Sequence, residues 1–240
     1  MGSNIDKLYW TVQSILDKLA LQFGNITAAI HRKAGNTVQE KRVRPKSEEK
    51  RSQIIDAAGI LFVVNGFEKV SMEEIAKSAG VSKQTVYSHF GNKQQLFTAA
   101  IDCKCDEYDL APNKTQQAMH CEEYLIFFAT HLCALLTSDD AIGVFRVCVA
   151  EAGRSEVGEL FWQAGPGKIR AQLAGYLTEQ VKLGTLLIDD IDTAAGQLIS
   201  MIVCESQFRS VLGLQKSKND IELKEYATQC ARLFYKGYRA

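Results

Sequence analysis

The stretch 71-SMEEIAKSAGVSKQTVYSHF-90 decides the fold, because it reads as two short helices joined by a tight turn. Ser71 has the residue type of an N-cap, and Glu74 follows three residues later at the reciprocal position of a capping box. Gly80 stands where the first helix must end in a left-handed residue, and Ser82 is placed to cap the second helix. The sequence therefore predicts a helix-turn-helix over residues 71–90.

The second of these helices is expected to present a polar face. Val81, Val86 and Phe90 are spaced to pack inward. A short helix whose free side carries polar, mostly uncharged donors suits the major groove of duplex DNA. The residues on that free side are Lys83, Gln84, Thr85, Tyr87, Ser88 and His89.

Helices are also expected on both sides of this motif. Ser47 is placed to cap an upstream helix that ends at Asn65-Gly66, and Asn92 is placed to cap a downstream one. Together they predict a compact unit over residues 47–105. An extension at residues 1–46 precedes it, and residues 106–240 read as a further array of helices.

Residues 79–90 and 92–97 resemble the signature of the DNA-binding domain of the TetR family of bacterial transcriptional regulators. Gln84 departs from it, since a small residue or Pro is commoner there. The stretch 145–152, with Phe161 and Gly165-Pro166-Gly167, resembles the C-terminal domain of the AefR-like branch of that family more loosely. The resemblance implies an all-α protein with an N-terminal helix-turn-helix domain and a C-terminal ligand-binding and dimerisation domain. It also implies a homodimer paired through its last two helices, and a repressor that a small-molecule effector releases from a palindromic operator.

Roles in DNA binding follow from position on the second helix. Lys83, Gln84 and Thr85 lie at its start, where they would reach guanine, adenine and a thymine methyl group respectively. Phosphate contacts are expected from Ser71, Tyr87, Ser88, His89 and Lys93, with Ser82 completing the set. His89 has an alternative interpretation as an exposed or core-edge residue.

The extension at residues 1–46 combines an apolar stripe with a basic end. The stripe, from Ile5 to Ile30 at helical spacing, favours an amphipathic helix that packs on the protein or its dimer mate. A membrane-surface anchor is the alternative, but the polar side of the stripe is not basic enough for it. The stretch 41-KRVRPK-46 is either a solvated linker or an arm along DNA, in which Arg42 and Arg44 are the candidates.

Aromatic, Cys, Met and His side chains in the C-terminal half are candidates for the wall of an effector pocket. For each one taken singly, core packing is the favoured explanation. Taken together they favour an apolar, aromatic, lipid-like or drug-like ligand with few polar anchors. The candidates are Phe127, Phe128, His131, Phe145, Cys148, Phe161, Trp162, Tyr176, Met201, Cys204 and Phe208.

Charge is distributed unevenly along a chain whose formal net charge is zero. Residues 1–105 carry 15 Lys and Arg against 10 Asp and Glu, whereas residues 106–240 carry 13 against 18. This asymmetry is expected if only the first half contacts phosphate. Scarce Pro and the absence of strand-like alternation favour an all-α fold.

Other classes of protein find little support in the sequence. The seven cysteines have neither disulfide nor metal-ligand spacing, so we expect free thiols, no metal and no cofactor. No secretory signal or membrane-spanning stretch is recognised, which favours a cytoplasmic protein. An enzyme is disfavoured because no catalytic spacing appears, and a DNA-binding dimer without ligand control is the remaining alternative.

Overall fold

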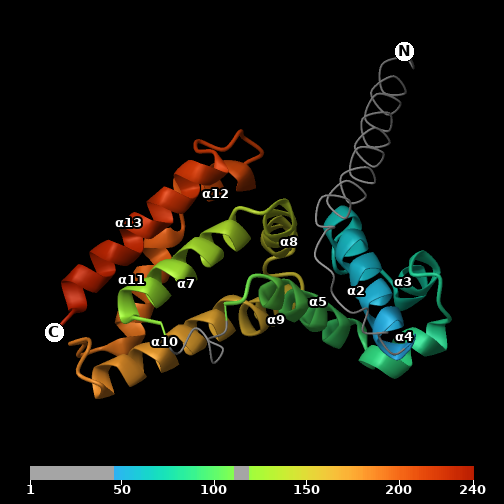
Figure 1. The fold of residues 1–240 in the computed structure, drawn as a ribbon. Coiled ribbons are helices and arrows are strands. Elements are labelled where there is room, and N and C mark those ends of the chain that lie inside the picture. Colours follow the sequence, from blue (N-terminus) through green and yellow to red (C-terminus); the bar gives the residue numbers. More distant parts are fainter. Residues whose placement is uncertain (1–45, 111–118) are drawn as a thin grey trace, which may run out of the picture. The chain divides into compact units, whose positions relative to one another are not determined.

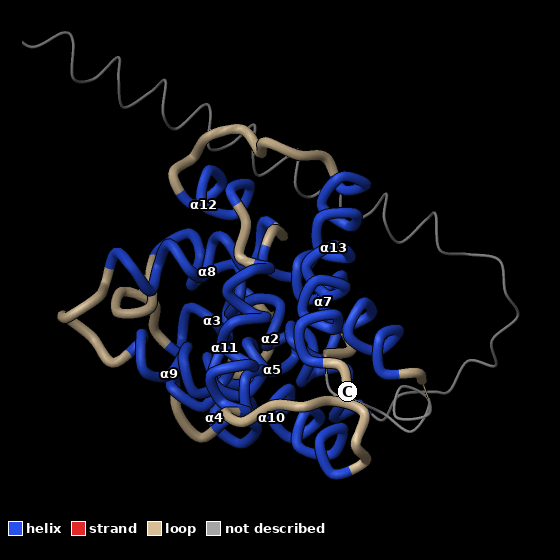
Figure 2. Tube along the Cα trace, turned by 90° about the vertical axis from the view of Figure 1, so that its left-hand side faces the viewer, coloured by secondary structure: helices blue, strands red, loops and turns tan. Residues whose placement is uncertain are grey.

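The computed structural model describes residues 46–110 and 119–240, and all the regular elements in these residues are helices (Figure 1, Figure 2). An isolated antiparallel bridge joins Leu186 to Arg239. The first helices are α2 (Lys46–Asn65), α3 (Met72–Ser78), α4 (Lys83–Phe90) and α5 (Lys93–Glu107). They are followed by α7 (Cys121–Leu136), α8 (Asp139–Ala150), α9 (Val157–Ala164), α10 (Pro166–Lys182), α11 (Ile191–Ile202), α12 (Glu205–Val211) and α13 (Asp220–Tyr238). The predicted all-α fold is confirmed.

The first core holds helices α2 to α5 together around three aromatic rings. The ring centroids of Phe62 and Phe67 lie 5.5 Å apart, and Phe97 lies 5.5 Å from Phe62 and 5.2 Å from Phe67. The two contacts of Phe97 are edge-on, an arrangement that aromatic quadrupoles favour. Val86 and Phe90 of α4 are buried in the same core. This packing fixes which side of α4 faces outward.

Helices α8 and α9 contribute to this first core although they follow α7 in the chain. Val147 and Cys148 of α8, with Val157 and Ala164 of α9, are buried together with the residues of the helix-turn-helix unit. The second core is formed mainly by α7, α10, α11 and α13. The cores therefore do not follow the sequence boundary expected at residue 105, which also falls inside α5.

Two helix starts differ from the sequence prediction. Helix α2 already includes Lys46, so Ser47 lies inside its first turn and is not its cap. The sequence also places Asp192 as the cap of a helix running to Leu212. Helix α11 is instead capped by Asp190, because the Asp190 carboxylate accepts a hydrogen bond from the backbone N–H of Thr193 at 3.0 Å. That carboxylate is also bonded by the Thr193 hydroxyl at 2.6 Å, so Asp190 offers a two-point cap that Asp192 does not.

The helix expected to run from Asp192 to Leu212 is interrupted. Val203 and Cys204 adopt extended backbone angles between α11 and α12. The Ser206 hydroxyl then bonds to the Ser217 hydroxyl at 2.9 Å and accepts the backbone N–H of Lys218 at 3.1 Å. These bonds to the segment ahead of α13 favour the break, although the local sequence contains no Pro or Gly at that point.

The predicted helix and basic linker at residues 1–45 lie outside the described residues, and so do Arg42 and Arg44.

Candidate nucleic-acid interface

The start of α4 is fixed by the side chain of Ser82. Its hydroxyl accepts the backbone N–H of Thr85 at 3.1 Å and lies 2.8 Å from the Thr85 hydroxyl. The preceding turn contains Gly80 with φ of +66°, which a glycine adopts without strain. Helix α3 is in turn held by the predicted capping box of Ser71 and Glu74. The helix-turn-helix predicted over residues 71–90 is therefore confirmed in its caps and in its turn.

The outer side of α4 is polar and accessible. Lys83, Gln84, Tyr87 and Ser88 are exposed, whereas Thr85 and His89 are half-buried. Tyr87 is 45% exposed, a large fraction for an aromatic side chain on a helix that already buries Val86 and Phe90. Of the six α4 residues expected to contact DNA, four are thus accessible and two are partly so.

Lys83 is not tightly held by its protein partner. Its ammonium group lies 3.3 Å from the Glu73 carboxylate, and both side chains are largely exposed. Such a surface ion pair contributes about 1 kcal/mol or less. Phosphate or a guanine base edge would therefore displace Glu73 at little cost.

Lys93 has well-formed contacts within the protein. Its ammonium group donates to the backbone carbonyls of Phe67 and Glu68, at 3.0 and 3.2 Å, and lies 4.6 Å from the Phe67 ring centroid. These bonds attach the start of α5 to the turn between α2 and α3. The expected phosphate contact of Lys93 stays a prediction, and it would compete with this structural role.

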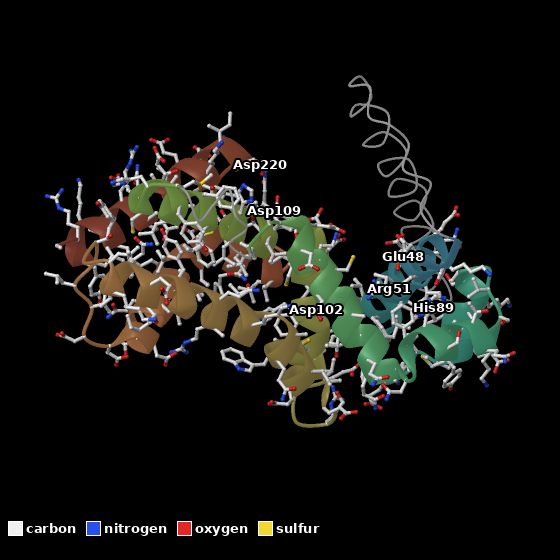
Figure 3. All side chains as sticks on the ribbon, turned by 60° about the horizontal axis from the view of Figure 1, so that its bottom comes forward. Glu48, Arg51, His89, Asp102, Asp109 and Asp220 are labelled. Carbon is white, nitrogen blue, oxygen red and sulfur yellow. The ribbon has the colours of Figure 1, made fainter. Side chains whose placement is uncertain are left out.

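Arg51 is a basic residue near α4 that the sequence analysis missed. Its guanidinium carbon lies 5.5 Å from the ring centroid of Phe90, and Figure 3 labels it together with His89. The helical spacing of the residues around Arg51 could have revealed it. Arg51 precedes the buried Ile54 and Ile55 by one helical turn, so it lies on the inward side of α2.

Polar contacts tie the helix-turn-helix unit to the helices that follow. The backbone N–H of Glu68 donates to the Glu151 carboxylate at 3.3 Å, and Lys104 of α5 pairs with Asp140 of α8 at 2.9 Å. Burial lowers the pKa of Lys104, but hydrogen bonds to Glu107 and Asp140 outweigh it and raise that pKa. Lys168 of α10 pairs with Asp102 of α5 (Figure 3) at 2.6 Å. These contacts join α8, its C-terminal end and α10 to α5 and to the turn after α2.

The effector-pocket candidates do not come together at one place. Phe128, Tyr176 and Cys204 are buried in the second core, whereas Cys148 and Phe161 belong to the first. Phe145, Trp162 and Phe208 are exposed at the surface. Met201 lines a cleft between α11 and α13. The last two candidates, Phe127 and His131, contact each other, with ring centroids 3.9 Å apart.

Two buried hydroxyls lie in the second core without a hydrogen-bond partner among the described residues. They belong to Tyr124 and Tyr176, whose rings stack with centroids 3.7 Å apart. Burial raises the pKa of Tyr124 to about 12. The sequence analysis missed Tyr124, although it lies one turn before Phe128 on the buried stripe of α7.

Within the described residues, no cluster of three or more His, Cys, Asp or Glu side chains is arranged to hold a metal ion. No helix among those residues has the length and apolar character that crossing a membrane requires.

Comparison with known proteins identifies the class to which this fold and interface belong. The model for bacterial regulatory proteins of the tetR family matches residues 54–100, and the C-terminal domain of AefR-like transcriptional repressors matches residues 123–240. The chain is 35% identical over 69 residues to the HTH-type transcriptional regulator TtgR of Pseudomonas putida. That match covers 29% of this chain and only 33%, about a third, of TtgR.

Solved structures match over a greater length. A TetR-family transcriptional regulator from Mesorhizobium loti superposes with a TM-score of 0.67 at 26% identity, covering 82% of this chain and 100% of that one. The flavonoid-responsive regulator FrrA superposes with a TM-score of 0.62 at 30% identity, covering 80% of this chain and 98% of that one. The fold is that of bacterial transcriptional regulators. The chain belongs to the TetR family, and its C-terminal domain is AefR-like.

Proposed function

We propose that this protein is a homodimeric repressor that binds a pseudo-palindromic operator through α4 and leaves it when a small apolar or aromatic ligand binds the C-terminal domain. The observation that best supports this proposal is that α4 buries some of its side chains and exposes others. Val86 and Phe90 are buried, whereas Lys83, Gln84 and Tyr87 are exposed. That division gives a rigidly held helix whose free face carries base-reading and phosphate-binding groups.

Sequence reading is assigned to the first turn of α4. Lys83 donates to guanine, Gln84 forms a two-point contact with adenine, and the Thr85 methyl meets a thymine methyl. Thr85 is half-buried and shares its hydroxyl with the cap at Ser82, so its methyl group is the part left for a base. Tyr87, Ser88 and His89 hold phosphates, with Ser71, Lys93 and the arm at Arg42 and Arg44 adding contacts on either side.

The dimer is assigned to α11 and α13. Leu233 is 64% exposed on α13, which is unfavourable for a large aliphatic side chain in water. It borders an almost wholly apolar cleft lined by Gln197, Ser200, Met201, Leu233, Phe234, Gly237 and Tyr238. Pairing these helices across a two-fold axis covers the cleft and provides the second copy of α4.

Ligand control is supported by the connection between the two cores. Contacts from Asp140 of α8, from Glu151 directly after that helix, and from Lys168 of α10 reach the helix-turn-helix unit. A ligand that prefers one arrangement of these helices would shift the separation of the two recognition helices. FrrA is described as flavonoid-responsive, so flat aromatic compounds are the first class of ligand to test.

Selection of bound duplexes from random sequence, with the full chain purified, tests DNA recognition. We expect two half-sites related by two-fold symmetry, with centres about one helical turn, or roughly 10 base pairs, apart or a multiple of it. Recovery of unrelated sequences whose binding vanishes uniformly with salt would contradict the proposal.

Ligand control has a separate test. A flavonoid and a set of apolar aromatic compounds are screened for a rise in the unfolding temperature of the protein. The same compounds are tested for release of the selected duplex from the protein. A rise that is accompanied by release supports control by ligand. DNA binding that none of the stabilising compounds alters would favour the ligand-independent dimer.

A further inference from the structure

Helix α4 carries one lysine and no arginine, and that lysine is paired within the protein. The helix reads KQTVYSHF, so Lys83 provides its only Lys or Arg charge. The Lys83 ammonium group donates to the Glu73 carboxylate of α3 at 3.3 Å. The helix proposed to read DNA therefore presents this charge with an acidic neighbour directly beside it.

The carboxylate of Glu73 is not needed to build α3. That task falls to Glu74, whose carboxylate accepts the backbone N–H and the hydroxyl of Ser71, both at 2.8 Å. Glu73 is 76% exposed, and in the part of the chain that the structure describes, Lys83 is the only group bonded to its carboxylate. Because the cap is complete without Glu73, its contact with Lys83 calls for another explanation.

The pair with Glu73 leaves Lys83 able to contact a base. A lysine ammonium group has three N–H donors, and Glu73 uses one of them. The Lys83 side chain is 56% exposed, so the other two donors are accessible. Two donors match the O6 and N7 acceptors of guanine. Lys83 can therefore contact guanine without leaving Glu73.

The neighbouring carboxylate affects phosphate and guanine differently. Breaking the ion pair costs little, but Glu73 remains close to any group that Lys83 contacts. A phosphate is an anion, and it would lie well within the Debye length of about 8 Å, so Glu73 repels it. Guanine O6 and N7 have no formal charge and escape this repulsion. Glu73 therefore disfavours the phosphate contact of Lys83 and tolerates the base contact.

We propose that Glu73 is a positioning residue that directs Lys83 to a base edge and away from phosphates. Glu73 touches no DNA in this arrangement and acts only through Lys83. Its effect is to make the start of α4 read sequence instead of adding affinity for every duplex. The inference rests on the proposed binding of DNA through α4.

The salt dependence of binding to a duplex of unrelated sequence tests this role in the full chain. Each lysine newly engaged with a phosphate steepens the slope of log affinity against log salt by about 0.9. In Glu73→Gln, Lys83 is free to bind phosphate. We therefore expect tighter binding at low salt and a slope steeper by about 0.9 for each α4 bound. Adding Lys83→Ala to Glu73→Gln should return the slope to that of the wild type.

Glu179→Gln is the matched control. Glu179 forms a similar exposed pair with Lys182, at 2.7 Å near the end of α10, so this variant removes the same charge without touching α4. Its slope should be that of the wild type. A purely structural role of Glu73 has the opposite signature, because a less stable α3 would weaken binding to every duplex.

Base preference on the selected operator provides a second readout. Lys83→Ala should lose discrimination at one base pair by about fivefold or more, which identifies the position that Lys83 reads. Glu73→Gln should reduce discrimination at the same position and leave the position read by Gln84 unchanged.

The outcomes separate this inference from the proposed function. If the wild type selects an operator but Glu73→Gln keeps the wild-type slope and base preference, the inference is wrong and the proposed function stands. A steeper slope that persists after Lys83→Ala is added also overturns it, since Glu73 would then act without Lys83. If the wild type selects no operator, the proposed function fails and the inference falls with it.

Discussion

At the scale of single residues, Gln84 and Tyr87 lie one turn apart on α4 but are expected to affect DNA binding differently. Gln84→Ala removes a base contact and should alter preference at one operator position by about 1–3 kcal/mol. Tyr87→Ala removes a phosphate contact and should weaken binding to all sequences alike. Binding of each variant to the selected operator and to single-base changes of it, by fluorescence anisotropy at fixed salt, measures both effects.

Lys182→Ala provides the control for these two variants. Lys182 is an exposed cation at the end of α10, paired with Glu179 at 2.7 Å, and removing it changes net charge without touching α4. Its affinity for the operator should be that of the unmodified protein. A Gln84→Ala variant with unchanged base preference would refute the division of roles.

Tyr124 allows a prediction about stability at the residue scale. Its buried hydroxyl has no hydrogen-bond partner among the described residues, and such a group costs about 1–3 kcal/mol. Tyr124→Phe should therefore leave the free energy of unfolding unchanged or raise it by about 1 kcal/mol, as measured by urea denaturation.

Tyr226→Phe is the matched comparison, since the Tyr226 hydroxyl donates to the Met201 carbonyl at 2.7 Å. That variant should lose about 1 kcal/mol. A comparable loss in Tyr124→Phe would mean that the Tyr124 hydroxyl has a partner in the folded protein.

At the scale of elements, the capping box of α3 links helix stability to pH. Ser71→Ala removes a hydroxyl that accepts the Glu74 N–H and donates to the Glu74 carboxylate at 2.8 Å. It should cost about 1 kcal/mol at pH 7. The backbone N–H and the hydroxyl of Ser71 lower the pKa of Glu74 below its ordinary value of 4.5. The contribution of the box is therefore complete above that value and is lost as pH falls through the folded-state pKa.

Urea denaturation of the wild type and Ser71→Ala at pH 7 and at pH 3 measures this linkage. The difference between the two proteins should shrink as pH falls and the Glu74 carboxyl group takes up its proton. Ser78→Ala, at an exposed serine on the same helix, should differ from the wild type by a few tenths of a kcal/mol at either pH. A difference that stays constant with pH would contradict the linkage.

Sequence reasoning was accurate where structure is determined locally. Caps such as Ser71, Ser82 and Asn92 act within three residues, and Gly80 needs only its own backbone conformation. The break at Val203 and Cys204 was missed, because it depends on bonds from Ser206 to residues 217 and 218. Long-range contacts of this kind leave no periodic signal in the sequence.

The DNA-binding candidates and the effector-pocket candidates also differ in how far local sequence determines their positions. Most of the residues proposed to contact DNA lie on one short helix, whose cap and buried residues fix which of its side chains are accessible, and their contacts with DNA stay a prediction. The pocket candidates came from several different helices and joints, and residue type alone did not distinguish the buried Phe128 from the exposed Phe208. Which aromatic residues face one another is decided by tertiary packing.

At the scale of the whole molecule, DNA binding is expected to depend on pairing through α11 and α13. Leu233→Glu places a charge in the apolar cleft beside Met201 and Phe234, where a two-fold partner would bury it without a counter-ion. We expect monomers by sedimentation velocity at micromolar concentration. Each monomer carries a single α4, so affinity for the two-half-site operator should fall at least tenfold, which corresponds to about 1.4 kcal/mol.

Ile221→Glu distinguishes pairing from a general effect of charge on α13. Ile221 is 80% exposed at the start of the same helix and does not line the cleft, so this variant should remain dimeric and bind the operator normally. Binding of Leu233→Glu to a single half-site should also be unchanged, because α13 packs on α7 and α11 and not on α4 or its core. A dimeric Leu233→Glu protein would place the two-fold interface on another surface. A monomer with full operator affinity would instead show that symmetry adds nothing to recognition.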